Sequence, residues 1–261
     1  MKKHAVIKCF LVSLSLVLLV SCGKNSSTRA ESAGTEVEKN VSSSQPVEPK
    51  AENAYEKFRK AEEENVIGDE EQQLAELSAA LEKLEFEYAE DETIGDFLMV
   101  ASPRCGENIE QGKSCVMPLI YILGPSVEPL LVVGFDCVGD EYLGIDTVEV
   151  DTNRYRYTLN STNFIGDIEK DKVEILSNQE KMIELAMGVV TTDEEIDMLI
   201  DMIESDAVNL RFGKYNTAKP DLVECPMPEN DRQAIVDVLN AYYLYLNTTQ
   251  AVRAKALAEL T

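Results

Sequence analysis

Apolar and polar residues alternate most regularly over residues 148–159, on both sides of Asp151-Thr152-Asn153. A period of two places successive side chains on opposite faces of a strand, and a short polar segment between two such runs is typical of a hairpin turn. The pattern predicts a β-hairpin with one buried face and one face in water. Its apolar residues are Val148, Val150, Tyr155, Tyr157 and Leu159.

Other short segments rich in apolar and β-branched residues predict further strands. Glycine and proline residues, which interrupt regular structure, separate several of these segments from one another. The predicted strands cover Asp96–Val100, Val116–Leu123, Leu130–Cys137, Val208–Phe212 and Leu222–Cys225.

Two helices are predicted from capping boxes, in which Ser177 is followed by Glu180 and Thr192 by Glu195. In this motif the hydroxyl accepts a hydrogen bond from the third helical N–H, and the glutamate carboxylate accepts one from the N–H of the cap. The second helix has an apolar stripe at steps of three and four residues, which predicts its buried face. The stripe consists of Ile196, Leu199, Ile200 and Ile203.

A last helix is predicted over Glu229–Leu246, and the tail at 248–261 is expected to be a frayed helix. Residues 51–92 are rich in Ala, Glu, Lys and Leu and predict a helical segment with a break at 66–69. Its second half has the spacing of a coiled-coil seam, at Leu74, Leu77, Leu81, Leu84 and Tyr88. Two interpretations are open: a coiled coil that forms an oligomer, or a single amphipathic helix that lies on its own domain. The second is favoured, because two heptads are too few for a coiled coil.

Strands come first and helices later, without the strict alternation of a parallel sheet. This order predicts an α+β fold, with a mostly antiparallel β-sheet or sandwich and packed helices. The globular domain is expected over 93–247, because about 150 residues suffice for one hydrophobic core. The amphipathic helical segment would precede it.

The N-terminus resembles a bacterial lipoprotein signal. Basic residues precede the apolar run Cys9–Val20, which is shorter than the roughly 20 apolar residues of a spanning helix. The run ends in Leu19-Val20-Ser21-Cys22, which resembles the lipobox of bacterial lipoproteins. The resemblance implies cleavage after residue 21 and attachment of acyl chains such as palmitate to Cys22; an ordinary secretory signal is the alternative. Two acyl chains give lasting anchorage, whereas one gives only marginal binding.

The resemblance also implies an extracytoplasmic location on a membrane, at the cell envelope. Gly23 follows the lipidated position in place of the aspartate that marks inner-membrane retention, so the outer membrane is favoured if the cell has two. Residues 22–50 hold too little apolar surface to fold and are expected to be a disordered tether. Its length of about 28 residues corresponds to a reach of about 90 Å.

The chain is strongly acidic, with a formal net charge of −24 that becomes −27 when the three lysines of residues 1–21 are removed. A surface of this sign repels phosphate backbones, so nucleic acid is not expected as a partner. The expected partners are the membrane, through the lipid anchor, and an envelope protein or ligand of unknown identity.

Four cysteines follow Cys22, in a compartment where disulfides persist. An even number fits two bridges, and three pairings are open. We expect Cys105 to pair with Cys115, because the intervening segment resembles one loop, which leaves Cys137 with Cys225. Free thiols in an anaerobe are the alternative. Zinc is disfavoured because the chain has no CxxC pair and its one histidine, His4, lies in the signal.

Residues 131–146 have a distinctive order of predicted elements. An apolar strand is followed by a Gly139-Asp140 turn, an aromatic-plus-apolar pair at Tyr142-Leu143 and the hairpin described above. This order resembles a sheet segment of a family of uncharacterised bacterial lipoproteins. The resemblance extends over about residues 93–247 and implies a fold but no activity. Tyr142 stands where tryptophan is common in that family. In physical terms the turn is tight and Tyr142 is expected to be a core ring.

Candidate catalytic chemistry is sparse. The run Gly106–Ser114 has one residue too many for a phosphate-binding P-loop, and without histidine no Ser-His-Asp site can form in the mature chain. The acids on the predicted helix after Thr192 are expected to form a solvated face rather than a calcium site. No cofactor and no metal are therefore expected. A non-enzymatic binding or interaction module is favoured; the alternative is a carboxylate-based hydrolase acting on envelope or dietary glycan.

Overall fold

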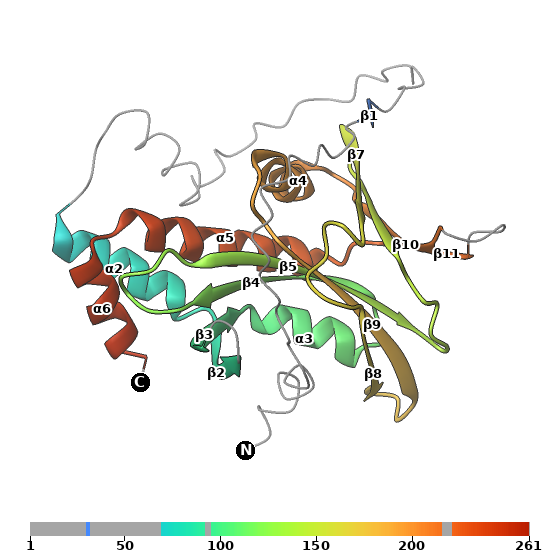
Figure 1. The fold of residues 1–261 in the computed structure, drawn as a ribbon, viewed down its shortest axis with the longest axis horizontal. Coiled ribbons are helices and arrows are strands. Elements are labelled where there is room, and N and C mark those ends of the chain that lie inside the picture. Colours follow the sequence, from blue (N-terminus) through green and yellow to red (C-terminus); the bar gives the residue numbers. More distant parts are fainter. Residues whose placement is uncertain (1–29, 32–68, 92–94, 216–220, 261) are drawn as a thin grey trace, which may run out of the picture.

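The computed structural model describes residues 30–31, 69–91, 95–215 and 221–260 (Figure 1). The predicted signal peptide and most of the predicted tether, Cys22 included, lie outside these residues, as does the predicted helix over 51–68. In chain order the elements are β1 (Ala30–Glu31), α2 (Glu70–Leu81), β2 (Glu85–Asp91), β3 (Gly95–Ala101), α3 (Pro103–Glu110), β4 (Cys115–Ile122), β5 (Leu130–Gly139), β6 (Thr147–Asp151), β7 (Tyr155–Asn160), β8 (Glu169–Glu174), β9 (Glu180–Val189), α4 (Asp193–Glu204), β10 (Asn209–Lys214), β11 (Asp221–Pro226), α5 (Glu229–Asn247) and α6 (Gln250–Ala258).

The strands form two antiparallel sheets, which confirms the α+β prediction. One sheet has five strands in the order β1-β7-β6-β10-β11, and the other has six in the order β2-β3-β4-β5-β9-β8. The predicted hairpin is β6–β7, in which Val150 lies opposite Tyr157 and Val148 opposite Leu159. The other predicted strands are β3, β4, β5, β10 and β11.

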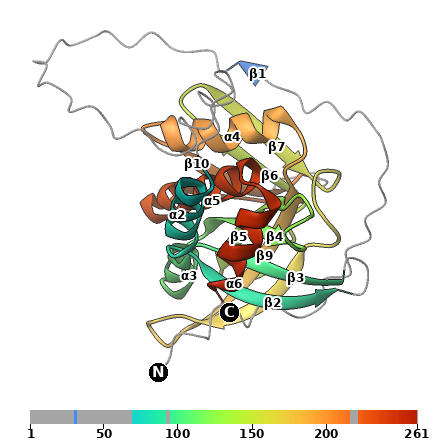
Figure 2. The same cartoon turned by 90° about the vertical axis from the view of Figure 1, so that its left-hand side faces the viewer.

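The main core lies between the two sheets and the helices that pack against them (Figures 1 and 2). Phe135 from the six-stranded sheet and Phe212 from the five-stranded sheet both belong to it, as does Leu239 from α5. Burial of such a side chain stabilises the fold by roughly 1.5–3 kcal/mol. Helix α2 packs against α5 and α6. A second apolar cluster lies on the opposite face of the six-stranded sheet and includes Phe97, Met117 and Tyr121.

The helical prediction over 51–92 is wrong for its last part. Helix α2 begins after the N-cap Asp69 and ends at Leu81, and residues 85–91 form strand β2, paired with β3. The supposed seam therefore breaks: Leu84 precedes the strand and Tyr88 is 67% exposed within it. Pairing with the apolar strand β3 outweighs the helix propensity of the Glu-rich segment. For α2 itself, the interpretation as a single helix on its own domain is confirmed.

The two capping boxes have opposite outcomes. Thr192 and Glu195 cap α4 as predicted, and both hydrogen bonds of the box are present. The helix predicted from Ser177 is wrong, because residues 175–179 form the turn of the β8–β9 hairpin, with Asn178 at φ 56°. The long pairing of β9 with β5 determines this outcome, since β9 is buried over most of its length.

The last helix, α5, is confirmed. The tail is also helical, but α6 is not frayed: Thr249 caps it, and Val252 and Ala256 are buried in the main core. None of the helices in the described ranges is long and apolar enough to cross a membrane.

The loop after β5 is held by a buried carboxylate. Glu184, which is 2% exposed, accepts hydrogen bonds from the backbone N–H groups of Leu143, Gly144 and Ile145, at 2.5–3.3 Å. Such a row of N–H groups binds an anion, here supplied by the protein itself. The prediction that Tyr142 is a core ring is wrong: it is 41% exposed, and its hydroxyl donates to the Asp171 carbonyl. Lys170 Nζ lies 5.7 Å from the centroid of this ring, so the ring packs against the surface of β8 rather than in the core.

Candidate functional site

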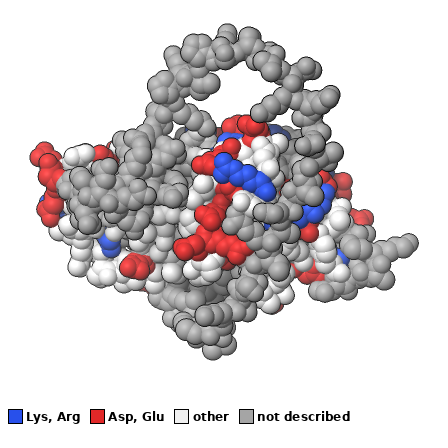
Figure 3. Space-filling model, turned by 90° about the horizontal axis from the view of Figure 1, so that it is seen from above, with Lys and Arg blue, Asp and Glu red and all other residues white. Residues whose placement is uncertain are grey.

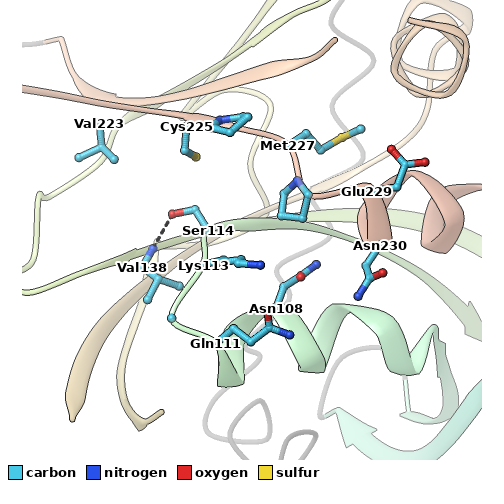
Figure 4. A pocket seen from close by; sticks show the side chains of 13 residues that line it. Asn108, Gln111, Lys113, Ser114, Val138, Val223, Cys225, Met227, Glu229 and Asn230 are labelled. Atoms are coloured by element: carbon cyan, nitrogen blue, oxygen red, sulfur yellow. Dashed lines mark hydrogen bonds between the residues drawn. The ribbon is translucent and has the colours of Figure 1, made fainter. Parts of the chain in front are cut away.

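A pocket of about 560 Å³ lies between the C-terminal end of α3, the inner side of β11 and the first turn of α5 (Figure 4). This volume lies within the range typical of small-molecule sites. Its lining residues are Asn108, Gln111, Gly112, Lys113, Ser114, Val138, Val223, Cys225, Pro226, Met227, Pro228, Glu229 and Asn230.

Helix α3 forms one wall, in a region where the sequence had predicted a loop. Ser102 is its N-cap and accepts a hydrogen bond from the N–H of Arg104, with Pro103 at the first helical position. Serine followed by proline is a typical helix start, so the signal was present in the sequence. The run resembling a P-loop lies in α3 and the turn before β4; a helix precedes the turn and a strand follows it, the reverse of the order that a P-loop requires.

Asp231 of α5 connects this helix to α3, the other helical wall of the pocket, and to strand β4. It is fully buried in the first turn of α5, and its carboxylate accepts hydrogen bonds from Asn108 Nδ2 of α3 at 2.6 Å and from the N–H of Val116 of β4 at 2.8 Å. Burial raises the pKa of Asp231 to about 7, although both hydrogen bonds act to lower it. The same contact orients Asn108, which lines the pocket.

A second buried acid lies behind this wall, on β5. Asp136 is fully buried, and the thiol of Cys115 is 3.6 Å from its Oδ2, whereas Oδ1 has no hydrogen-bond partner among the described residues. Burial raises the pKa of Asp136 to about 7. Asp136 and Asp231 were not singled out from the sequence. The sequence did contain two usable signals. Asp136 is an isolated acid within an apolar strand, and Asp231 lies four residues before Ile235, on the same face of a helix.

The four later cysteines are free thiols in the structure. Cys115 Sγ is 4.0 Å from the carbonyl oxygen of Cys105, and both residues are buried. Cys137 belongs to the main core, and Cys225 packs against the same core from β11. The two bridges stay a prediction.

Thiol chemistry is disfavoured at all four positions. Burial is the largest cause of the raised pKa of each of the four thiols. The pKa of the Cys137 thiol is raised to about 12. A thiol acts as a nucleophile or metal ligand in its deprotonated form, so these groups are held in the unreactive form. Within the described residues, no group of three or more His, Cys, Asp or Glu side chains has an arrangement suited to a metal ion.

The polar side of the pocket is formed by amide side chains and one lysine. In Figure 4, Asn108, Gln111, Lys113 and Asn230 lie on the same side of the pocket, with Asn230 beside Asn108. Asn230 Nδ2 also donates to Glu107. Glu229 is the sole acid among the described lining residues, so the facing carboxylate pair of a glycosidase is not found in this pocket.

The acids of α4 were predicted to form a solvated face, and Figure 3 shows acidic side chains gathered in the middle of the face that carries this helix. Asp201 is an exception that corrects the prediction. It is 6% exposed and accepts hydrogen bonds from the Tyr157 hydroxyl at 2.5 Å and from Arg154 at 3.2 Å. It therefore connects α4 to β7 rather than facing solvent.

Comparison of the chain with models of known protein families, with curated proteins and with solved structures gives no match. The interpretation of the pocket therefore depends on its own geometry.

The buried acids predict an unusual pH dependence of stability. Asp136 has a folded-state pKa of about 7, against 3.8 as its ordinary value. Between these pH values the unfolded chain loses the proton and the folded chain keeps it, so the free energy of unfolding falls as pH rises from about 4 to about 7. We expect Asp136→Asn to remove part of this fall, and to stabilise the protein at pH 8 relative to the parent, on the order of 2–4 kcal/mol.

Urea unfolding of the parent and the variant at pH 5 and pH 8 measures this difference. Asp140→Asn is the matched control, since Asp140 is exposed, and its pH profile should follow that of the parent. Parallel profiles for Asp136→Asn and the parent would contradict the assignment.

Proposed function

We propose that this chain is a lipid-anchored, non-enzymatic binding module of the cell envelope, and that the pocket between α3 and α5 is its ligand site. The observation that carries the proposal is the pocket itself: a partly open cavity of about 560 Å³ lined by amide groups and by apolar side chains. Such a combination is typical of sites that hold a small ligand by shape and a few directed hydrogen bonds.

The chemistry around the pocket supports binding over catalysis. A nucleophile needs a lowered pKa or an adjacent base, but burial raises the pKa of the Cys225 thiol that lines the pocket. The two acids whose pKa lies near 7 are buried behind the wall rather than exposed to a substrate. Their hydrogen bonds connect structural elements, as expected of groups that maintain a cavity.

The lipobox resemblance at residues 19–22 supports the location. Acylation of Cys22 would hold a strongly acidic domain at a membrane whose anionic lipids would otherwise repel it. The glycine at position 23 favours the outer membrane in a cell with two membranes. A tether between anchor and domain would leave the pocket free to meet ligands away from the lipid surface.

The anchor is tested by Cys22→Ser in the full chain. We expect the parent to partition into the detergent phase of a cloud-point separation and the variant into the aqueous phase, because the acyl chains supply the affinity for the micelle. Mass spectrometry of the parent should find Cys22 acylated at the new N-terminus. Cys225→Ser is the matched control and should partition like the parent. An aqueous parent with an unmodified thiol would contradict the proposal.

The pocket is tested by filling it. Val223 lines the pocket on the edge strand β11 and is 37% exposed, so Val223→Trp should occlude the cavity at little cost to the core. In ligand-observed NMR with a library of small polar compounds, we expect compounds that bind the parent to lose their signal with this variant. Val127→Trp, at an exposed position that is not part of the pocket lining, is the control. Compounds that bind Val223→Trp as well as the parent would place binding elsewhere.

A further inference from the structure

The charge of the pocket lining differs from that of the chain as a whole. The whole chain has a formal net charge of −24, yet the described lining holds one cation, Lys113, and one acid, Glu229. Lys113 is exposed and forms no salt bridge with a described residue. Its charge is thus available to a ligand. In Figure 4, Glu229 lies on the far side of Asn230 from Gln111 and Lys113.

The neighbouring polar groups add hydrogen-bond donors to this cation. Asn108 is 2% exposed, and its amide is oriented by Asp231, so it is a rigid part of the wall. Gln111 and Asn230 present further carboxamides. Asn108 Nδ2 and Asn230 Nδ2 each donate to a carboxylate of the protein, Asp231 and Glu107, so the ammonium group of Lys113 supplies the main attraction for a ligand. An ammonium group favours an anionic acceptor, because a charge-assisted hydrogen bond is roughly twice as strong as a neutral one.

The first turn of α5 faces the same cavity and contributes in the same sense. Pro228 is the N-cap, and no side chain caps the helix. The positive end of the helix dipole is therefore not offset by a capping side chain at the pocket. This contribution is secondary to the cavity and its lysine, since Glu229 and Asp231 in the same turn act against it.

The rest of the lining is apolar. Val223, Met227 and two prolines line the pocket from β11 and the segment before α5, and Val138 lines it beside Ser114, where it packs with Ile109 of α3. A ligand that fills the cavity therefore needs a hydrophobic body as well as a polar end. Methionine and proline side chains present no hydrogen-bond donors, so this wall selects by shape and hydrophobicity.

We propose that the α3–α5 pocket binds a small organic carboxylate, with its carboxylate at Lys113 and Gln111 and its apolar body against Val138, Val223 and Met227. The inference rests on the proposed function, because it assigns a ligand class to that same site. The whole chain is acidic and repels an anionic ligand at long range. Lys113 attracts the ligand's carboxylate at short range, once the ligand has entered the pocket.

The test compares benzoate with benzamide, which have the same shape and differ in charge. Binding to the detergent-solubilised full chain is measured by isothermal titration calorimetry and by the chemical shift of the Asn230 backbone amide. We expect benzoate to bind about tenfold more tightly than benzamide, and Lys113→Gln to remove that preference. Lys83→Gln is the matched control: Lys83 is exposed and does not line the pocket, so the preference should be unchanged.

The outcomes separate the ligand class from the site. Equal affinity for the two probes overturns the carboxylate assignment, and so does an unchanged preference for benzoate in Lys113→Gln. If neither benzoate nor benzamide binds, the assignment is also overturned. If both probes bind equally and Val223→Trp blocks them, the proposed site stands while the ligand class fails. If Val223→Trp leaves benzoate binding intact, the proposed site itself is wrong.

Discussion

The hydrogen bonds of one buried carboxylate hold the functional end of this molecule together. Asp231 accepts from Asn108 of α3 and from the backbone of Val116 of β4, and it belongs to the first turn of α5. Helices α3 and α5 line the pocket, and both of them pack against β4. A buried acceptor without a hydrogen bond costs free energy, so the burial of Asp231 depends on its donors, Asn108 and the N–H of Val116. This arrangement fixes the position of Asn108, which lines the pocket.

The scaffold behind this contact is an antiparallel framework whose strands pair over their full length. The six-stranded sheet has Asp136 in one of its central strands, opposite Cys115, and this buried acid has one oxygen without a hydrogen-bond partner among the residues that the structure describes. Burial of both acids raises their pKa to about 7, so the stability of the fold and the protonation of its interior are coupled. Burial also raises the pKa of the neighbouring thiols, which favours their neutral form.

Local sequence patterns predicted those elements whose own residues determine them. The β6–β7 hairpin has a strict period of two, and Thr192 with Glu195 satisfies a helix start locally. Long-range pairing decided the cases that failed. The same Ser-x-x-Glu spacing at Ser177 became a hairpin turn because β9 pairs with β5, and the segment around Tyr88 became a strand because β3 offers an apolar partner.

The candidate site was less predictable than the fold, because it depends on contacts between residues more than 100 positions apart. Composition did not indicate that Asn108 meets Asp231, although an acid on an apolar helix face was a usable signal. The prediction of Cys105 near Cys115 was spatially sound because few residues separate them, yet the intervening segment is a helix and a turn rather than one loop. Membrane attachment at Cys22 stays a prediction from the sequence.

The central claim is that Asp231 organises the wall of the pocket, and hydrogen exchange in Asp231→Ala tests it most directly. The amides of α3 and of Val116 should lose protection in the variant, while those of the β6–β7 hairpin, whose pairing does not involve this residue, keep it. Unchanged protection of α3 and Val116 in the variant would contradict the account.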